Sequence, residues 1–64
     1  MHKVEFTFKG MNFIVQRHPK TNTPMYRQKE HLGGAWSDAT TSAANTSLHA
    51  TFRKLLREAI TKLS

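Results

Sequence analysis

Residues 3–16 of the chain, KVEFTFKGMNFIVQ, alternate apolar and polar side chains on both sides of the dipeptide Lys9-Gly10. Alternation with period two is typical of a half-buried strand, and a two-residue turn containing glycine joins the strands of a hairpin. The stretch therefore predicts strands at about residues 3–8 and 11–17. Pairing across the turn makes one face apolar through three facing pairs: Phe8 with Met11, Phe6 with Phe13, and Val4 with Val15.

A second turn is indicated by HPKTNTP, residues 18–24. Pro19 favours the second position of a turn, and Asn22 tolerates the left-handed conformation where no glycine is present. These residues predict a four-residue loop and a third strand at about residues 24–29, placed at the sheet edge because Pro24 lacks an N–H group. The register sets Val15 opposite Tyr26 on the apolar face. The opposite face, called the open face below, would carry Lys3, Glu5, Thr7, Asn12, Ile14, Gln16, Met25, Arg27 and Lys29.

The remainder of the chain contains one strong pattern. Apolar residues from Leu48 to Leu63 recur at helical spacing and predict a helix at about residues 47–63. Residues 30–45 are expected to form a loop, although the stretch 38–45 could instead be a weak helical extension. Its helix propensity is poor because Thr, Ser and Asn dominate it. The predicted fold is α+β: a three-stranded antiparallel sheet with one C-terminal helix on its apolar face. The expected core consists of Phe6, Phe13, Val15, Trp36, Phe52, Leu56 and Ile60.

Composition limits the class of protein. A chain of 64 residues forms one small domain, and the absence of cysteine leaves packing, or packing with self-association as a homodimer, to stabilise it. The lack of cysteine also favours an intracellular, cytoplasmic setting. No apolar run approaches the roughly 20 residues that span a bilayer. A net charge of +6 favours a polyanionic partner, either nucleic acid or an acidic protein surface.

Catalytic and metal-binding motifs are absent from the sequence. The four histidines share no ligand spacing, no nucleophile elbow is present, and the glycines do not form a phosphate loop. The only carboxylates are Glu5, Glu30, Asp38 and Glu58, each of which has a structural role available. We therefore expect a binding protein without a cofactor or metal and without enzymatic activity.

The open face is the predicted binding surface. Asn, Gln, Arg and Lys are the side chains that contact base edges and phosphates, and a two- or three-stranded ribbon fits a major groove. DNA is favoured over RNA because the aromatic side chains needed for base stacking point into the core in this register. The predicted nucleic-acid-binding residues are Lys3, Lys9, Asn12, Gln16, Lys20, Arg27, Lys29, Arg53 and Arg57. An ordinary solvated sheet face remains the simpler interpretation.

Three strands followed by a helix, with an RHPKTN hairpin at residues 17–22, is similar in arrangement to the arm-binding domains of tyrosine recombinases and to plant-type AP2 domains. The resemblance covers the order of elements and one turn, and it implies that the sheet face would contact DNA.

The alternative function is docking on another protein, as an inhibitor or accessory factor of a phage or mobile element. The edge strand with Met25 and Tyr26 would then extend a partner's sheet, and Trp36 would provide an aromatic anchor. Salt dependence separates the two functions, because phosphate binding releases counterions whereas apolar anchoring does not.

Overall fold

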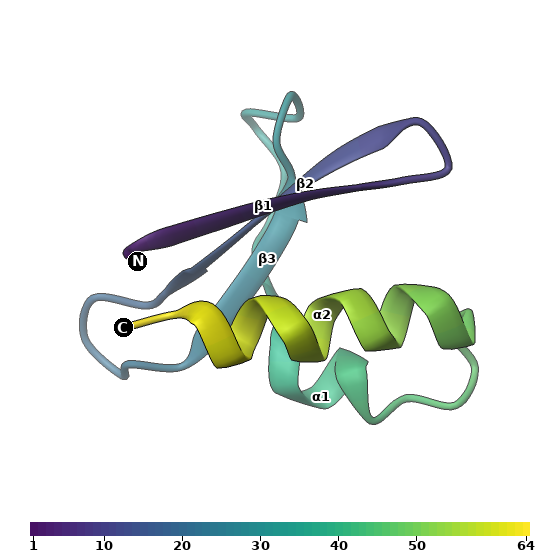
Figure 1. The fold of residues 1–64 in the computed structure, drawn as a ribbon. Coiled ribbons are helices and arrows are strands. Elements are labelled where there is room, and N and C mark those ends of the chain that lie inside the picture. The colour runs from purple at the N-terminus through teal and green to yellow at the C-terminus, as the bar shows by residue number, and fades with distance from the viewer.

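The computed structural model describes all 64 residues as a small α+β domain, with a sheet on one side and two helices on the other (Figure 1). The antiparallel sheet has the strand order β1-β2-β3-β4. The strands are β1 (Lys3–Phe8), β2 (Met11–Arg17), β3 (Pro24–Gln28) and β4 (Ser37–Asp38), and the helices are α1 (Ala39–Ala43) and α2 (Ala50–Lys62). The prediction of three strands and one helix was therefore incomplete, since the sheet has a fourth strand and a second helix precedes the C-terminal one.

The first hairpin has the predicted register. Val4 pairs with Val15, Phe6 with Phe13 and Phe8 with Met11. Both turn residues adopt the left-handed conformation, with φ of 51° at Lys9 and 77° at Gly10. A turn with two positive φ angles matches the twist of the strands that it joins, and this match fixes the pairing.

The second hairpin also has the predicted register. The His18 N–H donates to the Thr23 carbonyl at 2.8 Å, and Asn22 has the expected positive φ of 64°. Tyr26 pairs with Val15, and the Lys29 N–H donates to the Asn12 carbonyl at 2.9 Å.

The prediction that β3 lies at the sheet edge was wrong. Met25 and Tyr26 of β3 pair on their other side with Asp38 and Ser37 of β4. Pro24 remains compatible with this position because it is the first residue of its strand.

Both helices begin at a side-chain cap. The Asp38 carboxylate accepts hydrogen bonds from the N–H groups of Thr40 and Thr41, and this cap starts α1 within the segment that the sequence left undecided. Helix α2 begins at Ala50, three residues later than predicted, because the His49 imidazole accepts a hydrogen bond from the Thr51 N–H. Neither helix combines the length and apolar composition needed to cross a bilayer.

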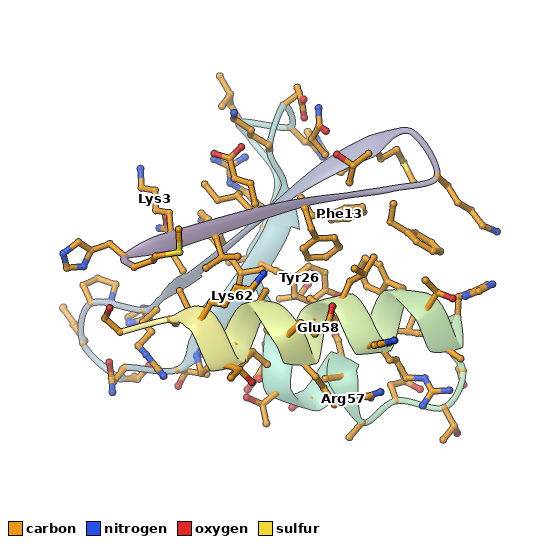
Figure 2. The ribbon with its side chains drawn as sticks, in the orientation of Figure 1. Lys3, Phe13, Tyr26, Arg57, Glu58 and Lys62 are labelled. Atoms are coloured by element: carbon orange, nitrogen blue, oxygen red, sulfur yellow. The ribbon has the colours of Figure 1, made fainter.

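The core lies between the sheet and the helices, with Phe52 of α2 at its centre. The Phe52 ring lies 5.0 to 5.7 Å from the ring centroids of Phe6, Phe8, Phe13 and Tyr26. Figure 2 shows Phe13 and Tyr26 pointing into this space. The Tyr26 hydroxyl donates to the Ser42 hydroxyl of α1 at 2.9 Å and so attaches the short helix to the sheet.

Six of the seven predicted core residues lie in this cluster, either buried or packed against it: Phe6, Phe13, Val15, Phe52, Leu56 and Ile60. Trp36 does not, and its placement in the core was wrong. Continuing the β3–β4 register by one residue sets Trp36 beside Arg27, on the open face. The small residues Ala39, Ala43 and Ala59 occupy the core instead and allow α1 and α2 to approach each other.

Candidate nucleic-acid interface

Strand alternation brings four of the predicted contact residues onto the open face, as expected: Asn12, Gln16, Arg27 and Lys29. Lys3 of β1 joins them because it pairs with Gln16, and its side chain points away from the helices in Figure 2. This shared location follows from the register and does not by itself indicate a ligand.

The polar side chains on the open face are largely paired with one another. Asn12 accepts a hydrogen bond from the Thr7 hydroxyl at 2.9 Å and donates to the Glu30 carboxylate at 2.7 Å. Lys29 forms an ion pair with Glu5 at 2.9 Å. Part of the donor and acceptor capacity that base recognition would require is therefore used within the chain.

These pairs shift two titrations in opposite directions. The hydrogen bond from Asn12 lowers the pKa of Glu30, with a smaller contribution from the charge of Lys29. The hydrogen bond and charge of Glu5 raise the pKa of Lys29. The Glu30 contribution to stability is present above the pKa of the unfolded chain and is lost as pH falls through the folded-state value. The Lys29 contribution is present below the unfolded value and is lost as pH rises through the folded one.

Arg27 is the most constrained cation of the open face. Its guanidinium carbon lies 4.7 Å from the centroid of the Trp36 ring. One guanidinium nitrogen donates to the carbonyls of Gln28 at 2.7 Å and Lys29 at 2.8 Å. Arg27 therefore holds the start of the loop that follows β3.

Ile14 lies at the centre of the open face, between Glu5 and Arg27 in the register. It is only 7% exposed although it lies outside the main core. A partner on this face would therefore reach Met25, which is half-buried, more readily than Ile14.

Acidic residues concentrate on the same side of the sheet. Glu5 and Glu30 lie on the open face, and Asp38 lies at its β4 edge, where its carboxylate caps α1. Since the chain has four carboxylates in all, only Glu58 lies elsewhere. The three cations of the open face, Lys3, Arg27 and Lys29, therefore lie among nearly as many carboxylates. These carboxylates reduce the attraction of the open face for phosphate.

The remaining predicted cations on the sheet lie in the two turns. Lys9 occupies the β1–β2 turn, with its ammonium 5.6 Å from the Phe8 ring centroid. Lys20 occupies the β2–β3 turn, where its backbone N–H donates to the His18 imidazole at 3.1 Å. Consecutive turns of an antiparallel meander lie at opposite ends of the sheet, so these two lysines do not form one patch.

The outer surface of α1, α2 and the connection between them, which we call the helical face, has a different composition. Residues 39–57 contain Arg53, Lys54 and Arg57 but no carboxylate, and they include six Ser and Thr residues. With Lys62, Glu58 and the α1 cap Asp38 included, the helical face carries four cations against two carboxylates. Most of its hydroxyl side chains, including Thr40, Thr41, Thr46 and Ser47, are exposed.

Two arginines of the helical face are held by backbone carbonyls. Arg53 Nε donates to the Leu48 carbonyl at 3.1 Å, and an Arg57 terminal nitrogen donates to the Ala43 carbonyl at 3.1 Å. In Figure 2 Arg57 extends from α2 toward α1. These bonds restrict the side chains while leaving further N–H groups of each guanidinium free of them.

Sequence reasoning included Arg53 and Arg57 but omitted Lys54, Lys62 and the hydroxyl side chains between Thr40 and Thr51. The feature of the sequence that could have indicated this surface is the run of 19 residues, 39–57, without a carboxylate. We found no group of three or more His, Cys, Asp or Glu residues placed to hold a metal ion.

No protein-family model, curated protein or solved structure matches this chain. The similarity in element order to arm-binding and AP2 domains therefore gains no support from these comparisons, and the site has to be interpreted from its own chemistry.

Proposed function

We propose that this protein is a small non-catalytic nucleic-acid-binding domain, with DNA as its first candidate partner, and that its helical face contacts the phosphates. The observation that supports this proposal is the separation of charge between the two sides of the sheet. Glu5 and Glu30 lie on the open face, whereas residues 39–57 of the helical face, between Asp38 and Glu58, combine three cations with no carboxylate. Phosphate contacts depend on such unopposed cations.

The side chains of the helical face also provide hydrogen-bond donors for phosphate oxygens. Arg, Lys, Ser and Thr donate most of the hydrogen bonds that proteins make to phosphate oxygens. Arg53 and Arg57 are already oriented by the carbonyls of Leu48 and Ala43, so less rotamer entropy is lost when they bind.

The open face remains a candidate for contacts to bases. Gln16 and Arg27 are half-buried and Asn12 is exposed, and the amide and guanidinium groups are those that recognise adenine and guanine edges. For this role Arg27 and Asn12 would have to exchange part of their present hydrogen bonds for bonds to DNA.

Protein docking is the second candidate function. The near balance of charge on the open face, together with its half-buried Trp36 and Met25, favours a partner that is less charged than DNA. In that case the complex should persist at high salt, and nucleic acid should not compete.

Fluorescence anisotropy with labelled duplex DNA, single-stranded DNA and RNA at two salt concentrations tests the proposal. We expect binding to duplex DNA at low salt that weakens steeply as salt rises, because cation–phosphate contacts release counterions. The double variant Arg53→Gln/Arg57→Gln removes two charges from the helical face, and Lys3→Gln/Lys29→Gln removes two from the open face as a matched control.

The proposal predicts a larger loss of affinity for the helical-face variant. A larger loss for the open-face variant would place the phosphate contacts on the sheet instead. Absence of binding to any nucleic acid at low salt would contradict the proposed function altogether.

A further inference from the structure

A shallow groove of about 370 Å³ runs between the two helices. Its α1 wall is formed by Thr40, Ala43 and Ala44, and its α2 wall is formed by Arg57, Ile60 and Thr61. The alanine methyl groups and the Ile60 side chain make the floor apolar, and polar groups lie on both walls. No carboxylate lines the groove, which distinguishes it from the open face.

Two of the three polar side chains in the groove, Arg57 and Thr40, have donors available. Arg57 uses one terminal nitrogen on the Ala43 carbonyl and retains other N–H groups of its guanidinium. The Thr61 hydroxyl donates to the Arg57 carbonyl at 2.9 Å, so its proton is already used. The exposed Thr40 hydroxyl on the opposite wall remains as a second donor. An anionic group between Arg57 and Thr40 would thus accept hydrogen bonds from both helices.

We infer that this groove seats one sugar–phosphate unit of a nucleic-acid duplex, with the phosphate between Arg57 and Thr40. This inference rests on the proposed function and names the subsite within the helical face. The apolar floor of Ala43, Ala44 and Ile60 accommodates the carbon face of the sugar. Arg53 and Lys54, one turn earlier in α2, extend the positive charge along the helix and would attract adjacent phosphates.

The distribution of aromatic residues selects a duplex over a single strand. Sequence-tolerant binding of single strands depends on exposed aromatic rings that stack with unpaired bases. The chain has six aromatic residues. Phe6, Phe8, Phe13, Tyr26 and Phe52 pack together in the core, and Trp36 is half-buried with Arg27 against its ring. With no free ring on the helical face, backbone contacts to a duplex are the interaction that this surface supports.

Filling the groove tests the subsite without removing charge. Ala44 is exposed and has ordinary right-handed backbone angles, so Ala44→Leu places a larger side chain in the groove without disturbing the core. Ala50→Leu makes the same change at an exposed position outside the groove and is the matched control. We expect Ala44→Leu to reduce affinity for a labelled 16-base-pair DNA duplex by about tenfold, and Ala50→Leu by less than about twofold, because only the former blocks the phosphate site.

A second pair of variants tests the role of Arg57. Arg57→Gln and Lys54→Gln each remove one charge from α2, but only Arg57 lines the groove. We expect Arg57→Gln to weaken duplex binding by about tenfold and Lys54→Gln by about threefold, since a hydrogen-bonded phosphate contact contributes more than a diffuse charge. Circular dichroism melting of each variant establishes that the fold is retained.

The outcomes separate the subsite from the function. Suppose that the unaltered protein binds duplex DNA. If Ala44→Leu and Ala50→Leu then have equal affinities, or if Arg57→Gln and Lys54→Gln do, the phosphate site in the groove is wrong and the proposed function still stands. Tighter binding of the corresponding single strand than of the duplex would overturn the choice of partner. Failure of the unaltered protein to bind any nucleic acid would overturn the proposed function itself, and the groove with it.

Discussion

The two sides of this domain use their charged residues differently. On the open face Lys29 pairs with Glu5, Asn12 pairs with Glu30, and Arg27 is occupied by Trp36 and loop carbonyls. On the helical face Arg53 and Arg57 bind only carbonyls, and no carboxylate occurs between residues 39 and 57. A regular pattern of polar residues along strands therefore does not locate the surface with unopposed charge. The positions of the few carboxylates locate it better.

The largest expected effect is a loss of folding stability when the core, which lies on one side of the sheet only, is altered. Phe52→Ala removes the ring at the centre of the aromatic cluster and should cost about 3 to 5 kcal/mol, enough to leave a small domain mostly unfolded. Trp36→Ala on the other side should cost about 1 kcal/mol or less, because Trp36 lies outside the core cluster and mainly contacts Arg27. Thermal melting of both variants compares the two sides. Equal losses would show that the open face contributes a second core.

A smaller loss of stability is expected when Arg27, which binds the loop after β3, is replaced. Arg27→Ala should destabilise the fold by about 1 to 2 kcal/mol, because the carbonyls of Gln28 and Lys29 lose a charged donor. Amide hydrogen exchange should become faster at residues 29–34, while residues 50–62 keep their protection. Unchanged exchange in the loop would mean that Arg27 is free to serve a partner.

The cap that begins the helical face should have an effect of similar or smaller size. Asp38→Ala removes the acceptor for the Thr40 and Thr41 N–H groups and should cost about 1 kcal/mol. Asp38→Ser retains a capping oxygen and should recover most of the loss. If both variants melt like the wild type, the cap does not determine where α1 begins.

The smallest effect is a titration on the open face. In Asn12→Ala the pKa of Glu30 should rise toward its ordinary value, because the hydrogen bond that lowers it is gone. Carbon-detected NMR titration of the Glu30 carboxyl measures this shift, and Thr7→Val is a control that leaves the Asn12–Glu30 bond in place. A Glu30 pKa that stays low in Asn12→Ala would mean that the open face is not paired as described.

The hairpins could be predicted from the sequence because their information is local. Lys9-Gly10 and the loop from Pro19 to Asn22 fix the turns, and strict alternation then fixes both registers. The segment from residue 29 to residue 49 could not be predicted in the same way. Its strand has two residues and its helix has five, which is too short for a periodic pattern to emerge.

The candidate site could be predicted only where it depends on local patterns. Alternation correctly grouped Asn12, Gln16, Arg27 and Lys29, but the partner of Asn12 is Glu30, which reaches it only through the fold of the following loop. Trp36 is likewise placed by β4 pairing with β3, a contact between short segments. The arginines of α2 were identified from the helical pattern, whereas the groove beside Arg57 requires α1, which the sequence left undecided.

The placement of the phosphate contacts on the helical face is tested most directly by the salt dependence of duplex binding in the two charge-matched double variants. Plots of log affinity against log salt should lose a slope of about 2 when Arg53 and Arg57 are changed to Gln, because about two phosphate contacts are lost. The slope should change by less than about 1 when Lys3 and Lys29 are changed to Gln, since Lys29 is paired with Glu5 and Glu30 lies on the same face. The opposite order, with the larger loss of slope in the open-face variant, would contradict the placement of the phosphate contacts on the helical face.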